Sequence, residues 1–212
     1  VEDRAYVPAE EQDFPAGISV RGVSERYSTQ APVSLYGATK VASEALALEY
    51  GATFDLPVWV NRCGVLAGAG QFGRPDQGIF AYWIHSWKQR MGLKYIGFDG
   101  HGHQVRDCLH PEDLAAMICL QLSAGKDESK PLIQNLAGGA ENAMSLRQLS
   151  DWCAARFQPM DVATEPKDRP FDIPWMVLDS SLAKQAWDWS PQRSVESVLE
   201  ELAQHAEAND DW

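Results

Sequence analysis

Apolar residues recur at helical spacing early in the chain. Val41, Ala45 and Leu48 fall on one face of residues 36–51, among residues that favour helices. Gly51 closes the periodic run, and glycine commonly stops a helix. The pattern therefore predicts one amphipathic helix over residues 36–51.

Five further stretches have the pattern of helices. One opens on a proline and acidic residues, which suit a helix N-terminus. Another begins with Ser145 and Gln148, which form a capping box. The last carries an apolar stripe made of Val195, Val198, Leu199 and Leu202. The predicted helices cover residues 79–90, 110–122, 145–157, 180–187 and 194–206.

Short apolar runs between these helices predict strands, because turn-forming residues bound each run. The runs are residues 57–63, 93–98, 131–139 and 175–179. Residues 1–35 are rich in Pro, Glu, Ser and Gly and show no sustained periodicity, so we expect an irregular segment there. Strands that alternate with helices indicate an α/β fold with a largely parallel sheet.

The composition is that of a globular protein. Of the 212 residues, 45% are hydrophobic and 23% are charged, and no apolar run is long enough to span a membrane. The formal net charge of −12 argues against a nucleic-acid partner, because it repels phosphate backbones. The four cysteines form no C-x-x-C pair, so we expect a cytoplasmic protein with reduced cysteines.

Tyr36 and Lys40 are candidate catalytic residues. Their spacing of four places both side chains on one face of the predicted helix. A phenol has a reference pKa of about 10, and a nearby ammonium group lowers the pKa of such a phenol toward the range of a useful acid or base. Y-x-x-x-K is a short motif, and a surface tyrosine and lysine at this spacing by chance would look the same.

Residues 68–73 have the literal form G-x-G-x-x-G, and Asp99 follows at about the distance of a ribose-binding acid. In a dinucleotide-binding turn, however, the glycines join a strand directly to a helix. Here several residues separate the strand from Gly68, and Arg74 and Pro75 come before the next helix. We therefore favour a substrate-binding loop.

Two other sets of residues could bind ions. Four residues of metal-ligating types occur together: His101, His103, Cys108 and His110. Their spacing matches no common zinc pattern, so we expect a turn with exposed histidines and no metal. Arg106 and Arg169 are candidates for an anionic ligand, since a guanidinium group pairs with a diphosphate through two hydrogen bonds. Two surface salt bridges would fit these arginines equally well.

Four motifs in order resemble the extended short-chain dehydrogenase/reductase family, in its nucleotide-sugar epimerase and dehydratase branch. SLYGATK is similar to the family's S-x-Y-G-x-S/T-K helix, and IGFDGHGHQVRDCLHPEDLA to its G-x-G-x-Q-x-R-D segment. RPFDIPWMVLDSSLAKQAWDWSP resembles the family's C-terminal motif. NRCGVLAGAGQFGRPDQG is similar to a loop of CDP-tyvelose (CDP-paratose) 2-epimerases. The resemblance runs from about residue 31 to the last residue.

The resemblance implies an NAD-dependent reaction. Tyr36 would be the acid/base at the reacting sugar carbon, and Lys40 would hold the nicotinamide ribose. The turn from Cys63 to Val65 would approach the nicotinamide. A hydride would leave the sugar and return to its other face, without net oxidation.

The resemblance also implies a nucleotide-sugar substrate. Gln71 and its loop would lie over the sugar nucleotide. Arg106, together with Arg169 and Asp172, would hold the diphosphate and nucleotide. Many relatives carry an Asn for the substrate at the position of Val65, so the identity of the sugar is left open.

The fold implied is a partial Rossmann-like parallel sheet, with its N-terminal half missing, and a smaller C-terminal α/β substrate-binding lobe. Residues 31–65 and 104–137 would supply the Rossmann elements, and residues 66–103 and 138–212 the lobe. The dinucleotide fingerprint and a catalytic Ser or Thr would precede Val1. We therefore expect the C-terminal part of a longer enzyme, inactive alone.

Two other functions fit the same sequence. A 4,6-dehydratase or a reductase of the family would share these motifs. A non-catalytic module derived from the family would bind a nucleotide sugar or a protein even after loss of the Tyr36 hydroxyl. Relatives commonly dimerise through the tyrosine-bearing helix, where Ala42, Ala45 and Leu46 could form the contact of a homodimer. Non-specific association through exposed apolar surface would fit the sequence equally well.

Overall fold

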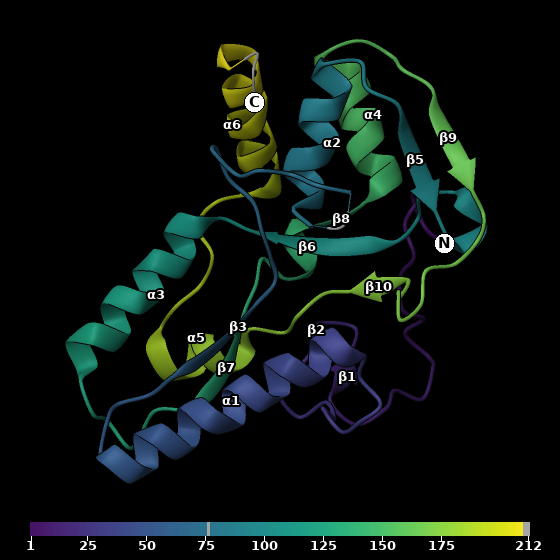
Figure 1. Cartoon of the computed structure of the whole chain (residues 1–212). Coiled ribbons are helices and arrows are strands. Elements are labelled where there is room, and N and C mark those ends of the chain that lie inside the picture. Colours follow the sequence, from purple (N-terminus) through teal and green to yellow (C-terminus); the bar gives the residue numbers. More distant parts are fainter. Residues whose placement is uncertain (76, 210–212) are drawn as a thin grey trace.

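The computed structural model describes residues 1–75 and 77–209. Helices alternate with short strands, as the sequence predicted (Figure 1). The helices are α1 (Leu35–Phe54), α2 (Ile79–Lys88), α3 (Pro111–Ala124), α4 (Leu146–Arg156), α5 (Ser181–Trp187) and α6 (Val195–Ala208), with short 3-10 turns η1 (Phe98–Gly100) and η2 (Ala140–Asn142). Among the described residues, no helix has the length and apolar character needed to cross a bilayer.

The sheet is built around one strand, β6 (Val105–Leu109). It pairs in parallel with β4 and β10 and antiparallel with β8. Two more parallel pairs, β3–β7 and β5–β9, and the antiparallel β1–β2 hairpin complete the strands. The remaining bounds are β1 (Ile18–Ser19), β2 (Gly22–Val23), β3 (Val60–Cys63), β4 (Val65–Leu66), β5 (Leu93–Ile96), β7 (Ile133–Leu136), β8 (Ala143–Ser145), β9 (Val162–Glu165) and β10 (Trp175–Met176).

Several strands have no counterpart among the predicted elements. In β6, Arg106 and Asp107 interrupt the apolar run VRDCL, so its pattern does not indicate a buried strand. β9 reads VATE and is exposed over most of its length, which removes the apolar signal. The β1–β2 hairpin corrects the expectation that residues 1–35 are irregular throughout.

The larger hydrophobic core lies where α2, α4 and α6 pack together against β5 (Figure 1). Trp83 and Trp87 of α2 are among its largest buried side chains. The predicted stripe of α6 is confirmed, because Val195, Val198, Leu199 and Leu202 are all buried. The capping box at the start of α4 is also present.

A second core joins α3, α5 and the β3–β7 pair, around Leu109, Met117 and Leu136. Trp187 ends α5 and Trp189 follows it, and the indole N–H group of each donates a hydrogen bond within this core. Trp187 Nε1 donates to Gln134 Oε1 at 2.6 Å, and Trp189 Nε1 donates to the Asp113 carbonyl at 2.9 Å. These bonds fix α5 to β7 and α3.

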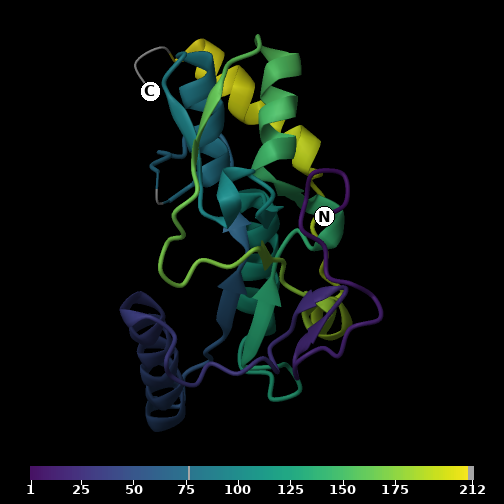
Figure 2. The same ribbon diagram turned by 90° about the vertical axis from the view of Figure 1, so that its right-hand side faces the viewer.

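α1 stands away from the rest of the molecule along most of its length (Figure 2). All of α1 is described, and within it Gly51 alone is buried. The predicted stop at Gly51 is wrong, because the helix continues to Phe54 and ends at Asp55, which has a left-handed φ of 55°. Gly51 instead permits close approach to the next segment, since a Cβ there would lie 2.8 Å from the Val58 side chain.

Candidate active site

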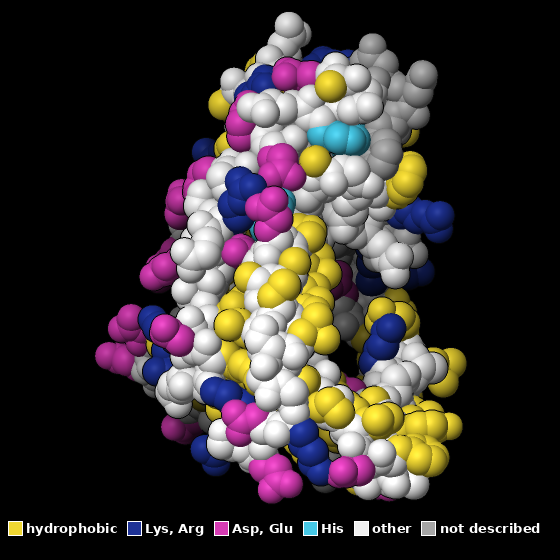
Figure 3. All heavy atoms as spheres, turned by 90° about the vertical axis from the view of Figure 1, so that its left-hand side faces the viewer, with side chains coloured by type: hydrophobic (Ala, Val, Ile, Leu, Met, Phe, Trp, Pro, Cys, Tyr) yellow, Lys and Arg dark blue, Asp and Glu magenta, His cyan; other side chains and the backbone are white. Residues whose placement is uncertain are grey.

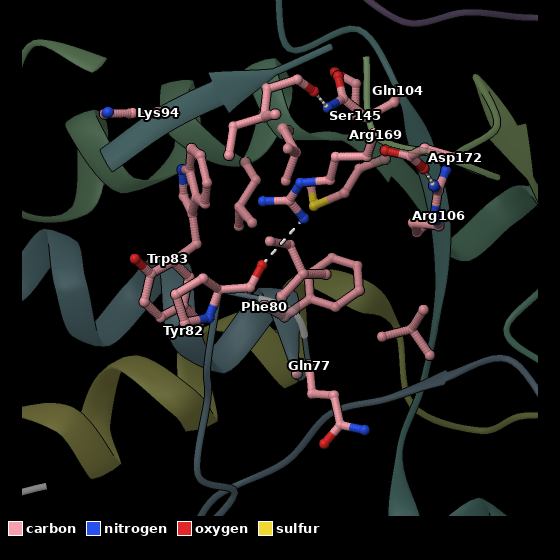
Figure 4. Close-up of a pocket in the computed structure, with 18 of the residues that line it drawn as sticks. Gln77, Phe80, Tyr82, Trp83, Lys94, Gln104, Arg106, Ser145, Arg169 and Asp172 are labelled. Carbon is pink, nitrogen blue, oxygen red and sulfur yellow. Dashed lines mark hydrogen bonds and ion pairs between the residues drawn. The ribbon is translucent and has the colours of Figure 1, made fainter. Parts of the chain in front are cut away.

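A cavity of about 740 Å³ lies between α2, β5, β6, the start of α4 and the segment before β10 (Figure 4). Its wall includes Tyr36, Val65, Pro75, Gln77, Phe80, Tyr82, Trp83, Lys94, Ile96, Gln104, Arg106, Met144, Ser145, Leu149, Arg169, Phe171 and Asp172. Aromatic side chains of α2 face cationic side chains from the strands and from the segment before β10 (Figure 4). Such a wall suits a ligand with a flat apolar part and an anionic part.

Arg106 and Asp172 form an ion pair on one side of this cavity (Figure 4). Arg106 Nη2 donates to Asp172 Oδ1 at 2.7 Å, and Nη1 donates to the Ile173 carbonyl at 3.0 Å. Burial lowers the pKa of Arg106, and the charge of Asp172 acts in the opposite direction. Two of the four residues that the resemblance assigned to the substrate therefore also bind each other.

Arg169 extends between the two sides of the cavity (Figure 4). Its Nη1 donates to the Pro75 carbonyl at 3.3 Å, which connects the segment before β10 to the loop before α2. Asp76, in the same loop, lies outside the described residues. The cavity thus brings Arg169 together with Arg106 and Asp172, although 63 positions separate the two arginines in the sequence.

Tyr36 and Lys40 lie in the first two turns of α1. The Ser34 hydroxyl caps this helix by accepting a hydrogen bond from the Gly37 amide at 3.0 Å. Lys40 Nζ is 5.2 Å from the centroid of the Tyr36 ring, so the two side chains share a face. Tyr36 is 67% exposed and reaches the edge of the cavity.

The turn after β3 contributes one of its two expected residues to the cavity. Val65 lines it, and β4 holds Val65 in register with Cys108 of β6. Cys63 lies in β3 and does not line it; its thiol donates to the Asn61 carbonyl at 3.7 Å. Burial raises the pKa of the Cys63 thiol.

Gln71 belongs to the loop that the sequence analysis placed over the substrate. Its Nε2 donates to the Leu66 carbonyl at 2.9 Å, and its side chain packs against Gly78. Gln71 therefore braces the loop between β4 and α2. The glycines at positions 68–73 lie within this loop and are separated from α2 by further residues, as the sequence indicated.

The four residues of metal-ligating types do not gather at one point. His101 and His103 lie side by side, with ring centroids 5.5 Å apart. Cys108 is buried in the core, and His110 faces Glu201 at 3.2 Å. Within the described part of the chain, no group of three or more His, Cys, Asp or Glu side chains could hold a metal ion.

Sequence reasoning missed two residues near the site. Asp107 is buried beside Gly64, in the turn that leads to Val65. Glu201 of α6 accepts a hydrogen bond from the Ala69 amide at 3.0 Å and so holds the loop before α2. Side chains alternate between the two faces of a strand, so a prediction of β6 would have placed Asp107 on the face opposite to that of Arg106. No local pattern in the sequence marks Glu201.

The family model for the NAD dependent epimerase/dehydratase family matches residues 14–137, which is more than half of the chain. The chain belongs to this family. This result confirms the resemblance carried by the four motifs, and it agrees with the expected cofactor, because the family is NAD-dependent.

Curated relatives within the family include both epimerases and dehydratases. CDP-paratose 2-epimerase of Salmonella typhi is 30% identical over 177 residues, covering 80% of this chain and 50% of that protein. UDP-glucuronate 4-epimerase of Thermodesulfobacterium geofontis is 28% identical, covering 87% and 54%. dTDP-glucose 4,6-dehydratase of Escherichia coli is 25% identical, covering 86% and 50%. The chain spans about half the length of the curated relatives it matches.

Solved structures show the same fold. A UDP-glucuronic acid 4-epimerase from Bacillus cereus, in complex with UDP-glucuronic acid and NAD, matches with a TM-score of 0.72 and 24% identity, covering 88% of this chain and 56% of that one. A dTDP-glucose 4,6-dehydratase from Bacillus anthracis, in complex with NAD, matches with a TM-score of 0.73 and 23% identity, covering 99% and 61%. The expected relation to Rossmann-type epimerases and dehydratases is thus confirmed.

Proposed function

We propose that this chain supplies the acid/base and substrate-binding part of an NAD-dependent nucleotide-sugar epimerase, of the CDP-sugar 2-epimerase type. One observation carries the proposal: Tyr36 and Lys40 share a face of α1 at the edge of a cavity that also contains Arg106 and Arg169. The Tyr36 hydroxyl, which can donate and accept a proton, therefore lies at the same cavity as two guanidinium groups that can bind a diphosphate. The similarity to CDP-paratose 2-epimerase supports the choice of a CDP-sugar.

Each of these side chains has a separate task in the proposed reaction. The Tyr36 hydroxyl would exchange a proton with the sugar hydroxyl at the reacting carbon. The Lys40 ammonium would hold the nicotinamide ribose and stabilise negative charge on the tyrosine oxygen. Arg106 and Arg169 would bind the diphosphate, and Asp172 would orient Arg106 before the ligand arrives.

The residues present fit the nicotinamide end of NAD. Tyr36 and Lys40 offer a hydroxyl and an ammonium on an open helix face, and Val65 offers an apolar contact at the edge of the same cavity. Bound NAD would supply the hydride acceptor. Residues 31–65 and 104–137 would belong to the Rossmann part and residues 66–103 and 138–212 to the substrate lobe.

Substitution of Tyr36 in the whole protein tests the proposal. Turnover of a panel of CDP-, UDP- and dTDP-sugars would be followed by product NMR, and NADH by its absorbance. We expect Tyr36→Phe to reduce turnover by about 10²–10⁴-fold, because general acid/base catalysis contributes that factor. Tyr50→Phe is the matched control, since Tyr50 is an exposed tyrosine on the same helix.

The products distinguish this proposal from its alternatives. An epimerised sugar supports it, whereas a 4-keto-6-deoxy sugar would identify a dehydratase. Binding of nucleotide sugars that survives Tyr36→Phe, without turnover by the unaltered protein, would identify a binding module. A cytoplasmic location and a homodimer through α1 stay predictions, the second supported by exposed apolar side chains on that helix.

A further inference from the structure

A second cleft lies on the other face of β5 from the candidate active site. Lys94 and Ile96 of β5 line the active-site cavity, whereas Tyr95, between them, lines the second cleft, as expected where side chains alternate along a strand. The two hollows share no lining residue. Figure 1 shows the region, where β5, β9 and the N-terminal segment come together.

This second cleft, the basic cleft, has a volume of about 360 Å³ and a mostly polar wall. Its lining residues are Arg4, Tyr95, Gly100, His101, His103, Arg147, Val162 and Thr164. Two guanidinium groups and two imidazoles therefore converge from three separate segments, in a chain whose formal net charge is −12.

One carboxylate offsets part of this positive charge. Asp151 of α4 pairs with Arg4 at 2.5 Å and lies 3.8 Å from Arg147. Because a single carboxylate contacts two guanidinium groups, the cluster keeps a net positive charge. Both arginine side chains are about half exposed, so an ion can reach them from solvent.

The loop that carries the histidines is fixed before any ligand arrives. The Arg147 amide donates to the Gly102 carbonyl at 2.8 Å, and the Tyr6 amide donates to the His103 carbonyl at 2.9 Å. Gly102 has a φ of +74° and packs against the Tyr95 ring, where a Cβ would lie 2.5 Å from a ring carbon. The glycine thus holds the backbone close to Tyr95, and the flanking imidazoles line the cleft.

We propose that the basic cleft binds a phosphate group, either free or at the end of a small phosphomonoester. Phosphate accepts several charge-assisted hydrogen bonds at once, and guanidinium groups match its geometry through paired N–H donors. The cleft is small, at about 360 Å³, and Gly102 covers the Tyr95 ring in its wall. A compact anion therefore suits the cleft better than a nucleotide.

Binding of this anion should be linked to protonation of His103. Burial lowers the pKa of His103, and His101 and Arg147 act in the same direction. The other titratable groups around the cleft include Arg4, Tyr6, Tyr95 and Asp151, and the Tyr6 ring lies against His103 with centroids 5.8 Å apart. A bound anion would reverse part of this repulsion, so binding of phosphate should raise the pKa of His103.

Calorimetric titration of the chain with inorganic phosphate, at constant ionic strength, tests the proposal. We expect a site whose affinity Arg147→Gln weakens about tenfold or more, because a charge-assisted hydrogen bond is worth roughly 1.5–3 kcal/mol. His103→Gln is a second variant, and circular dichroism checks that each is folded. Arg169→Gln, which changes the active-site cavity, should leave the binding unchanged.

The outcomes separate the basic cleft from the active site. No binding, or binding lost in Arg169→Gln and kept in both cleft variants, overturns the proposal. Comparison of inorganic phosphate with glycerol 3-phosphate identifies the source of the group. Tighter binding of the ester indicates a phosphomonoester ligand, and equal binding indicates the free ion.

Discussion

Arg106 and Asp107 are neighbours on β6 with opposite environments, because successive side chains of a strand point to opposite faces. Arg106 lines the cavity. Asp107 is 1% exposed, and its Oδ2 accepts a hydrogen bond from the Leu178 amide at 2.7 Å. Its other oxygen packs against Gly64, where a Cβ would lie 2.0 Å away. The carboxyl group thus joins the turn before Val65 to the segment after β10.

Asp107 gives the stability of the chain a specific pH dependence. Burial raises the pKa of Asp107 from 3.8 to about 6, so the folded state holds a proton that the unfolded state releases. The resulting stability is present below about pH 4 and is lost as pH rises through about 6. We expect Asp107→Asn to remove this dependence, which amounts to at most about 3 kcal/mol.

Urea unfolding between pH 4.5 and 7.5 measures the effect. The free energy of unfolding of the variant minus that of the unaltered chain should increase as pH rises, because only the unaltered chain loses stability. Asp13→Asn removes an exposed carboxylate and serves as the control. Curves for Asp107→Asn that run parallel to those of the unaltered chain would contradict the prediction.

Glu201 is a second residue whose effect can be isolated. His110 Nδ1 accepts from the Glu112 amide, so His110 Nε2 carries the proton and donates to Glu201 Oε1 at 3.2 Å. The same oxygen accepts from the Ala69 amide at 3.0 Å. Loss of the carboxylate leaves the buried His110 imidazole without this acceptor, which costs roughly 1–3 kcal/mol, whereas the exposed Ala69 amide becomes free to exchange with water.

We therefore expect Glu201→Ala to speed hydrogen exchange at the Ala69 amide, read residue by residue by NMR. Glu196→Ala, an exposed glutamate on the same helix, should leave that amide unchanged. Equal exchange rates at Ala69 in the two variants would show that Glu201 does not hold the loop.

At the scale of elements, α1 differs from the other long helices. α2, α4 and α6 each bury several side chains in one core, whereas α1 buries Gly51 alone. Arg62 of β3 holds α1 through two hydrogen bonds to the Glu44 carboxylate, at 2.7 and 2.8 Å. This ion pair is therefore a principal link between the helix that carries Tyr36 and the sheet.

We expect backbone amides of α1 to exchange faster than those of α2 and α6, because few buried contacts oppose local opening. Glu44→Gln should lower the local stability of α1 by roughly 1–2 kcal/mol. Amide exchange along α1 should therefore become faster still. Glu49→Gln, exposed on the same helix, is the matched control. Exchange in α1 as slow as in α6 would refute the expectation.

The sequence predicted elements better than it predicted contacts. The stripe of α6 and the capping box of α4 depend on local spacing, and both are present. β6 could not be predicted in the same way, because its two charged residues are stabilised by distant partners. Arg106 is paired with Asp172, 66 positions away, and Asp107 accepts a hydrogen bond from the Leu178 amide. The spacing of Tyr36 and Lys40 is local, so that part of the site was predictable.

At the scale of the whole molecule, one face of the surface carries a group of exposed apolar side chains. Figure 3 shows hydrophobic side chains over α3 in the middle of one face and over the end of α1. Leu122 of α3 is 77% exposed and Leu46 of α1 is 62% exposed. Apolar surface of this kind commonly marks a protein contact.

We expect the chain to associate with itself in a concentration-dependent way, as measured by sedimentation velocity. Leu46→Lys combined with Leu122→Lys should shift it toward the monomer, because charged side chains oppose burial of these faces. Val20→Lys changes an exposed apolar residue on the β1–β2 hairpin and should have no effect. A monomer at all concentrations would contradict the prediction.

The central position of β6 also bears on how this protein can diverge. Along five residues the strand contacts three others, contributes Arg106 to the cavity and buries Asp107, Cys108 and Leu109. A substitution in β6 must therefore be compatible with strand pairing, with the wall of the cavity and with the buried core at the same time. We expect β6 to accept substitutions more slowly over evolutionary time than β9, where most positions face solvent.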